Sequence, residues 1–142
     1  MKQLSVFVEN KVGRLSAFLN VLKENDIDIS ALSLADTSEY GILRLVVDKP
    51  DEAVAALREF GVMVKCTQVI AAAMDDAPGG LATLLAVLTD ANIGIEYMYA
   101  FIGKAEGKAW TVLRVDDVEA AVEVFTKHGI AMHDDHDNYR KA

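Results

Sequence analysis

The stretch ENKVGRLSAFLNVL, residues 9–22, returns sixty-six positions later as DDAPGGLATLLAVL, residues 75–88. In both copies a polar loop leads through glycine into leucines spaced three and four residues apart, the period of one helix face. At an offset of sixty-eight a second set of residues repeats: Leu45, Val47, Asp48, Ala53, Val54 and Gly61 match Leu113, Val115, Asp116, Ala121, Val122 and Gly129. The chain is therefore a duplication of a unit of about 65 residues.

Each repeat is predicted to run strand, helix, strand, strand, helix, strand. Short β-rich runs, helical spacing and turn residues give the boundaries. The first repeat is expected to have strands at 4–8, 27–35, 40–47 and 62–69, with helices from Leu15 to about Glu24 and from Pro50 to about Phe60. The second is expected to have strands at 70–74, 93–102, 109–115 and 130–132, with helices from Leu81 and over 118–128.

This order predicts an α+β fold made of two ferredoxin-like βαββαβ units. Each unit is a four-stranded antiparallel sheet with two helices on one face and the strand order 4-1-3-2. The expected domains are residues 1–67 and 68–134, followed by a polar tail at 135–142. One face of each sheet lacks helices, and each unit has a small core, so the repeats are expected to pack together.

Composition excludes several classes of function. The 142 residues carry 22 acidic and 14 scattered basic side chains, for a net charge of −8, which disfavours nucleic acid and anionic membranes. No apolar run approaches the ~20 residues of a membrane span, and no secretory leader opens the chain. The lone Cys66 suits a reducing cytoplasm and is expected to be a small core residue.

The loop between the first strand and first helix of each repeat carries the functional signal. Gly13 allows a close backbone approach, and the following helix presents unpaired N–H groups and a positive dipole end that suit a carboxylate. Asn10 offers a donor and an acceptor side by side, although it also suits a ligand-free turn. A small zwitterion, an amino acid, would use both features.

The sequence 9–15, in this βαββαβ context, resembles the ACT domain family of amino-acid-binding regulatory modules, in particular its tandem members without a catalytic domain. Both repeats share the resemblance, over about 2–65 and 69–134. The first loop matches the ligand-loop pattern well. The second has the general Asp-x-x-Pro-Gly form at Asp75–Gly79 but lacks the asparagine, and Val8 stands where the family often has histidine.

The resemblance implies a ligand site where the loop of one unit meets the second strand of a neighbour. Apolar strand residues would cover the side chain of the ligand. In strand 95–101, period two places Tyr97, Tyr99 and Phe101 on one face and Glu96 and Met98 on the other. The candidate ligand-binding residues are Asn10, Lys11, Val12, Gly13, Arg14 and Leu15, their counterparts Asp76, Gly79, Gly80 and Leu81, and the strand residues Ser30, Ala31, Tyr97 and Met98.

The predicted function is a non-catalytic amino-acid-binding regulator, without cofactor or metal, that forms a homodimer and acts on a separate enzyme. One alternative is an assembly module that binds no small ligand. Another is an enzyme whose acid or base is Glu9, Asp75 or Glu96, although no nucleophile–base pair is visible. The cluster His133–Asp137 could bind a metal by composition, but we expect it to be a solvated tail.

Overall fold

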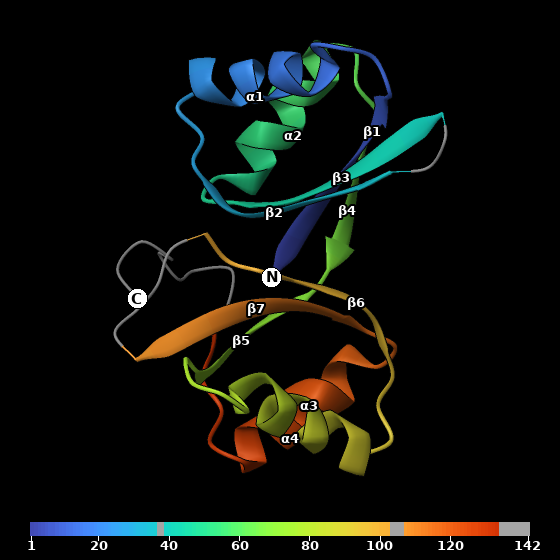
Figure 1. Ribbon diagram of the computed structural model, residues 1–142. Coiled ribbons are helices and arrows are strands. Elements are labelled where there is room, and N and C mark those ends of the chain that lie inside the picture. The colour runs from blue at the N-terminus through green and yellow to red at the C-terminus, as the bar shows by residue number, and fades with distance from the viewer. Residues whose placement is uncertain (37–38, 103–106, 134–142) are drawn as a thin grey trace. The chain divides into compact units, whose positions relative to one another are not determined.

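The computed structural model describes residues 1–36, 39–102 and 107–133, and its chain divides into two compact units. Residues 2–67 form the N-terminal unit, and Met1 with the residues from Gln68 onward forms the C-terminal unit. In the N-terminal unit both helices lie on the same face of the sheet (Figure 1). Its elements are β1 (Lys2–Glu9), α1 (Arg14–Glu24), β2 (Ile29–Asp36), β3 (Tyr40–Val47), α2 (Pro50–Glu59) and β4 (Val64–Gln68).

The C-terminal unit repeats this order and again carries both helices on one sheet face (Figure 1). Its elements are β5 (Ile70–Asp75), α3 (Gly80–Asp90), β6 (Ile95–Ala100), β7 (Lys108–Val115), α4 (Val118–Lys127) and β8 (Met132–His133). Within the described ranges, no helix has the length and apolarity that a bilayer span requires.

The sheets have the orders β2-β3-β1-β4 and β6-β7-β5-β8, which confirms the predicted strand order. The pairings are antiparallel, with Leu4 opposite Leu45 in one sheet and Ile70 opposite Leu113 in the other. In both units the second strand, β2 or β6, is an edge. The α+β fold with two βαββαβ units is therefore confirmed.

Each unit has its own hydrophobic core between sheet and helices. Phe18 and Leu22 of α1 and Leu57 of α2 are buried in one core, and Leu84, Leu88 and Phe125 are buried in the other. Two expectations fail here. Cys66 is exposed on β4 rather than buried, and Leu81, expected to face the core, is 38% exposed at the start of α3.

Several predicted strands begin too early, for two repeated reasons. The side chains of Asp48 and Asp116 accept the backbone N–H groups of Asp28 and Gly94, at 2.9 and 3.1 Å, which delays β2 and β6. Gly61 and Gly129, with φ of 90° and 67°, end their helices in the left-handed conformation. The next residues, Val62 and Ile130, then bond back to Leu57 and Phe125 at 3.1 and 3.0 Å, so they belong to the helix ends.

A β-bulge near the start of each second strand breaks the predicted alternation. The register shifts between Ile29 and Ala31, and between Ile95 and Tyr97. Ile95 and Met98 consequently both pack against the core although they are an odd number of positions apart, with two residues between them. Glu96 does not share a face with Met98 as expected, because it bonds Arg114, which alternates with the core residues Leu113 and Val115.

Gly80, the first residue of α3, has a packing requirement that its counterpart Arg14 lacks. A Cβ at position 80 would collide with the carbonyl oxygen of Asp75, at the end of β5. The first turn of α3 therefore packs directly on the end of its strand. In contrast, a Cβ at Gly13 or Gly79 would have no neighbour within 4 Å.

We expect Gly80→Ala to destabilise the C-terminal unit by about 1–3 kcal/mol, because helix and strand must separate to admit the methyl group. Arg14→Ala at the equivalent position should cost less than about 1 kcal/mol, as a surface change does. Urea unfolding of both variants measures the difference, followed by far-ultraviolet circular dichroism for the whole chain and by the emission of the single tryptophan, Trp110 in β7, for the C-terminal unit. An unchanged midpoint for Gly80→Ala would contradict the collision.

Candidate ligand site at the strand–helix loops

The loop between β1 and α1 is held by backbone hydrogen bonds and leaves its side chains outside. Asn10 N–H donates to the carbonyl of Glu39 at 3.3 Å, which ties the loop to the residue just before β3 of the same unit. Arg14 N–H donates to the carbonyl of Lys11 at 3.2 Å and closes the turn at Gly13, whose φ is 87°. The candidate residues 10–15 therefore form one compact group.

The loop between β5 and α3 has the same construction. Asp76 N–H donates to Gly107 O at 3.2 Å, as Asn10 does to Glu39, and Gly80 N–H donates to Ala77 O at 3.0 Å, as Arg14 does to Lys11. Gly79 has a φ of 84°. The two loops are thus repeated copies in hydrogen bonding as well as in sequence, and residues 76–81 are also one group.

The helices that follow these loops begin with neither a side-chain cap nor an acidic first turn, whereas each of the other two helices has at least one of these. Gly13 and Gly79 are the N-cap residues of α1 and α3, with no side-chain cap bond and no acidic residue in the first turn. In contrast, Asp117 caps α4 by accepting from Ala120 at 3.0 Å, and α2 has Pro50, Asp51 and Glu52 in its first turn. The positive ends of α1 and α3 are therefore left for an anion.

Most side chains of the first loop are exposed apolar groups or already have a partner within the unit. Val12 is fully exposed, and Lys11 pairs with Glu9 at 3.2 Å. The Arg14 guanidinium lies over the ring of Phe18, 5.5 Å from its centroid, and Leu15 packs partly against the core. These contacts leave the exposed Asn10 amide as the polar group at the loop.

A small open hollow of about 280 Å³ lies beside Asn10, lined also by Glu9, Lys11, Glu39 and Tyr40. Its lining is mostly polar and charged. A Cβ at Gly13 would meet nothing within 4 Å, so a substitution there acts through the positive φ and through access to the backbone, and not through a clash within the chain.

The second-strand candidates lie apart from the loops of their own unit. Ser30 and Ala31 lie at the bulge of β2, and Tyr97 and Met98 lie just past the bulge of β6. Because β3 separates β2 from β1, and β7 separates β6 from β5, each second strand is about 10 Å from the strand that leads into the loop. A ligand on a loop would therefore lie away from the second strand of the same unit.

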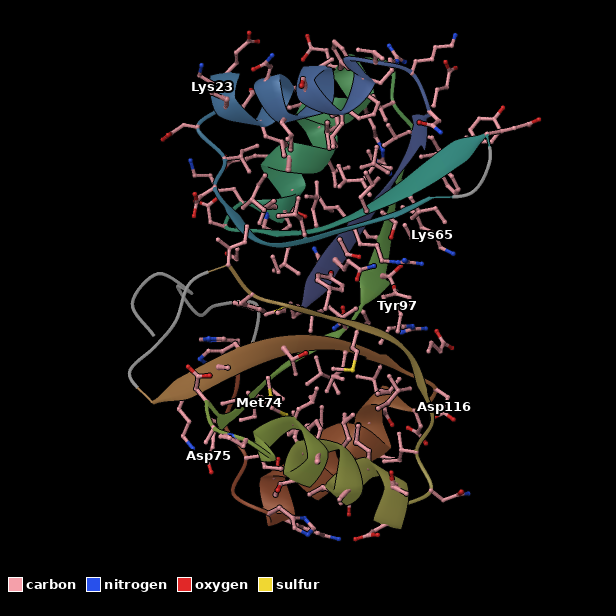
Figure 2. All side chains as sticks on the ribbon, in the orientation of Figure 1. Lys23, Lys65, Met74, Asp75, Tyr97 and Asp116 are labelled. Atoms are coloured by element: carbon pink, nitrogen blue, oxygen red, sulfur yellow. The ribbon has the colours of Figure 1, made fainter. Side chains whose placement is uncertain are left out.

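Tyr97 and Met98 lie on opposite faces of β6, and the bulge decides which of them faces the core. Met98 packs against the core of the C-terminal unit, whereas Tyr97 lies on the sheet face away from α3 and α4 (Figure 2). Of the two residues proposed to cover a ligand side chain, only Tyr97 is on the helix-free face. The bulge has no signal in the sequence beyond its repetition at Ser30 and Glu96.

An aromatic group that the sequence reasoning missed crosses the C-terminal sheet. The rings of Trp110 and His133 are 3.8 Å apart, and Phe101 stacks on His133 at 5.9 Å. Trp110 pairs with Ala73, and His133 pairs with Ala71, so two alanines of β5 leave the room for rings from the strands on either side to meet. The small residues Ala71 and Ala73 in β5 were the sequence signal that could have indicated these ring contacts.

The metal candidate is largely outside the described residues. Its residues 134–137 are among those the structure does not describe, and His133 is in the aromatic stack. Within 1–36, 39–102 and 107–133, no three His, Cys, Asp or Glu side chains come together as metal ligands.

Comparison with known proteins shows to which family the chain is related. A family model described as an ACT domain pair matches residues 1–141. None of the curated proteins compared with the chain matches it significantly. The crystal structure of protein BT0572 from Bacteroides thetaiotaomicron is similar at 36% identity and a TM-score of 0.87, covering 93% of this chain and 90% of that one.

Two more distant structures share the fold. The ligand-free regulatory subunit of aspartate kinase from Thermus thermophilus has 15% identity and a TM-score of 0.66, over 89% of this chain and 91% of that one. The corresponding subunit from Thermus flavus has 16% identity and a TM-score of 0.59, over 89% and 90%. On the family match and the 36% identical relative, the chain belongs to the ACT domain pair family.

Proposed function

We propose that the chain is a non-catalytic regulatory protein that binds a free amino acid at the loop of residues 10–15. The observation that carries the proposal is the uncapped start of α1. It has a left-handed glycine, a cation at Arg14 and no acidic residue in the first turn. A carboxylate would accept from the free N–H groups and offset the positive helix end.

The remainder of the ligand has partners of suitable chemistry. The Asn10 amide can hold a polar part of it, since an amide both donates and accepts. We propose that the second strand of a neighbouring unit covers the side chain, through Tyr97 or through Ser30 and Ala31. The distance of each second strand from its own loop supports this division between units.

The second loop is proposed as the weaker site. Asp76 replaces the asparagine, and its carboxylate repels a ligand carboxylate. The start of α3 is uncapped as in α1, so its first turn offers the same kind of site around Gly79, Gly80 and Leu81, but the loop lacks the amide side chain. This difference makes the two loops a matched pair for experiment.

The non-catalytic part of the proposal rests on the state of the three candidate carboxylates. Glu9 pairs with Lys11, Asp75 with Lys108 and Glu96 with Arg114. Their side chains are about half exposed or more, at 49%, 73% and 52%. All three therefore already have a cationic partner in their own unit.

The protein is proposed to act as a homodimer in the cytoplasm on a separate enzyme. The edge strands β2 and β6 present unpaired backbone groups that a two-fold pairing would satisfy. The exposed thiol of Cys66 suits a reducing compartment. The Thermus protein of the same fold is a regulatory subunit of aspartate kinase, which supports regulation as the general role.

The amino acid is expected to bind with a dissociation constant between about 1 µM and 1 mM, because so small a ligand has few contacts to offset association entropy. At roughly one hundred times that constant it should stabilise the protein by about 2.7 kcal/mol. A thermal-shift comparison of the twenty amino acids measures this. Absence of any shift at millimolar concentrations would favour the assembly module without a small ligand.

Gly13→Val should remove the thermal response, because valine disfavours the φ of 87° and the turn must change. Gly79→Val is the matched control: the φ is 84° and the space is equally open, so the intrinsic cost should be similar while the response remains. Asn10→Ala should weaken binding by about 1–3 kcal/mol. A normal response in folded Gly13→Val would overturn the loop assignment.

Light scattering at micromolar concentration should give the mass of two chains, since the open edge strands favour a closed pair. Replacing the edge residue Ser33 of β2 with proline should shift the protein toward one chain, because proline in an edge strand blocks pairing there. A single-chain mass for the unmodified protein would contradict the homodimer.

A further inference from the structure

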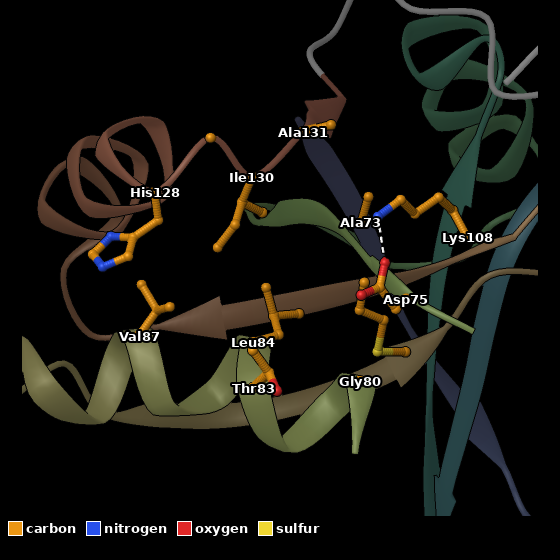
Figure 3. A pocket seen from close by; sticks show the side chains of 12 residues that line it. Ala73, Asp75, Gly80, Thr83, Leu84, Val87, Lys108, His128, Ile130 and Ala131 are labelled. Carbon is orange, nitrogen blue, oxygen red and sulfur yellow. Dashed lines mark hydrogen bonds and ion pairs between the residues drawn. The ribbon is translucent and has the colours of Figure 1, made fainter. Parts of the chain in front are cut away.

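The C-terminal unit contains a hollow of about 370 Å³ that is separate from the loop of α1. Its walls come from β5, from α3 and from the segment 128–131 that leads from α4 to β8. In Figure 3, His128 and Ile130 lie across the hollow from Val87 and Leu84 of α3. Lys108 and Asp75 form an ion pair beside Gly80, at one end.

The duplication explains why the hollow exists. At the equivalent place in the N-terminal unit, Arg14 lies over Phe18, and Phe18 contacts Phe60 edge-on with ring centroids 6.1 Å apart. The repeat offsets of sixty-six and sixty-eight place Gly80, Leu84 and His128 at these three positions. Each is smaller than its counterpart, and all three line the hollow.

The His128 ring does not take the place of the missing phenylalanine. Its Nδ1 lies 2.8 Å from the carbonyl of Val124, one turn back in α4, and the residue is exposed. Leu84 is buried but lacks the reach of a benzyl group. The region that the buried Phe18 and the half-exposed Phe60 cover in one unit is therefore open to an external group in the other.

The residues that line the hollow suit a ligand with an apolar side chain and a charged group at one end. Leu84, Val87, Ile130 and Met74 provide apolar surface, while Asp75 and Lys108 place one negative and one positive charge together at the rim. The N-terminal unit has Glu9 and Tyr40 at those two positions, so no cation faces the carboxylate from the neighbouring strand, and Glu9 pairs with Lys11 of its own loop. A zwitterion can pair with both charges at once, with its carboxylate on Lys108 and its ammonium on Asp75.

We propose that this hollow is a second binding site, for an α-amino acid with a large apolar side chain such as phenylalanine. The side chain occupies the space between α3 and Ile130, where the repeat has lost its rings. The amino and carboxylate groups lie at the Asp75–Lys108 pair. The site does not use the loop of α1, so binding at either place can fail while the other holds. It shares Gly80 with the second loop, which is proposed above as the weaker site.

Nuclear magnetic resonance of the full-length, ¹⁵N-labelled protein tests the proposal. Phenylalanine should shift the amide signals of Thr83, Val87 and Ile130 saturably. Phenylpropionate, phenethylamine and alanine each lack one of the three groups and should bind at least about tenfold more weakly, each factor of ten being about 1.4 kcal/mol. Signals of residues 10–15 report separately on the loop site.

The double variant L84F/H128F should abolish the shifts at the hollow, because it restores the ring pair that the N-terminal unit already accommodates. Lys108→Met, a surface change, should leave phenylalanine and phenethylamine with similar affinity. The proposal is overturned if the hollow amides do not move at phenylalanine concentrations up to about 50 mM, a range far weaker than typical ligand sites. It is equally overturned if L84F/H128F folds and still binds, or if Lys108→Met keeps the full preference for phenylalanine.

Discussion

The left-handed turn at Gly13 and Gly79 is the constraint from which the candidate sites follow. With φ of 87° and 84°, these positions cost an L side chain about 1–2 kcal/mol, so glycine is the favoured residue. A glycine N-cap has no side-chain oxygen to accept from the first turn. The turn that directs α1 and α3 back across their sheets therefore also leaves their N–H groups without a cap.

The four helices differ in how their N-terminal N–H groups are satisfied. Asp117 has an extended backbone, with a φ of −134°, and its side chain caps α4. The chain is thus able to cap a helix by the ordinary means, and α2 has acidic residues in its first turn instead. Only the helices that follow the first strand of a unit lack both devices. An anionic ligand is the group that would complete them.

The two repeats share one backbone fold but differ in the side chains of the loop and of the region beside its helix. The N-terminal unit keeps Asn10 in its loop and fills the region beside α1 with Arg14, Phe18 and Phe60. The C-terminal unit has Asp76 in the loop and leaves the matching region open beside Leu84. The same backbone therefore carries the proposed anion site with an amide in one unit and an apolar hollow in the other.

Sequence periodicity was enough to predict the strand order, because the repeats and the leucine spacing of Leu15 to Leu22 are local signals. The bulges at Ser30 and Glu96 were not predictable, since they depend on pairing with β3 and β7, and they moved Met98 into the core. The need for glycine at position 80 and the hollow near His128 depend on contacts between distant segments. The left-handed turn at Gly13 agrees with the loop pattern, while the binding roles of Gly13 and Asn10 stay predictions.

The most direct test of the account follows the first-turn amides of α1 by nuclear magnetic resonance while single amino acids are added. The account predicts that at least one amino acid shifts the Leu15 and Ser16 amides downfield and saturably, as hydrogen bonds to a carboxylate do. The first-turn amides of α2 and α4, which have their own acidic residues, should not move. If no amino acid moves the α1 amides, or if all helix starts move alike, the uncapped helix is not a ligand site.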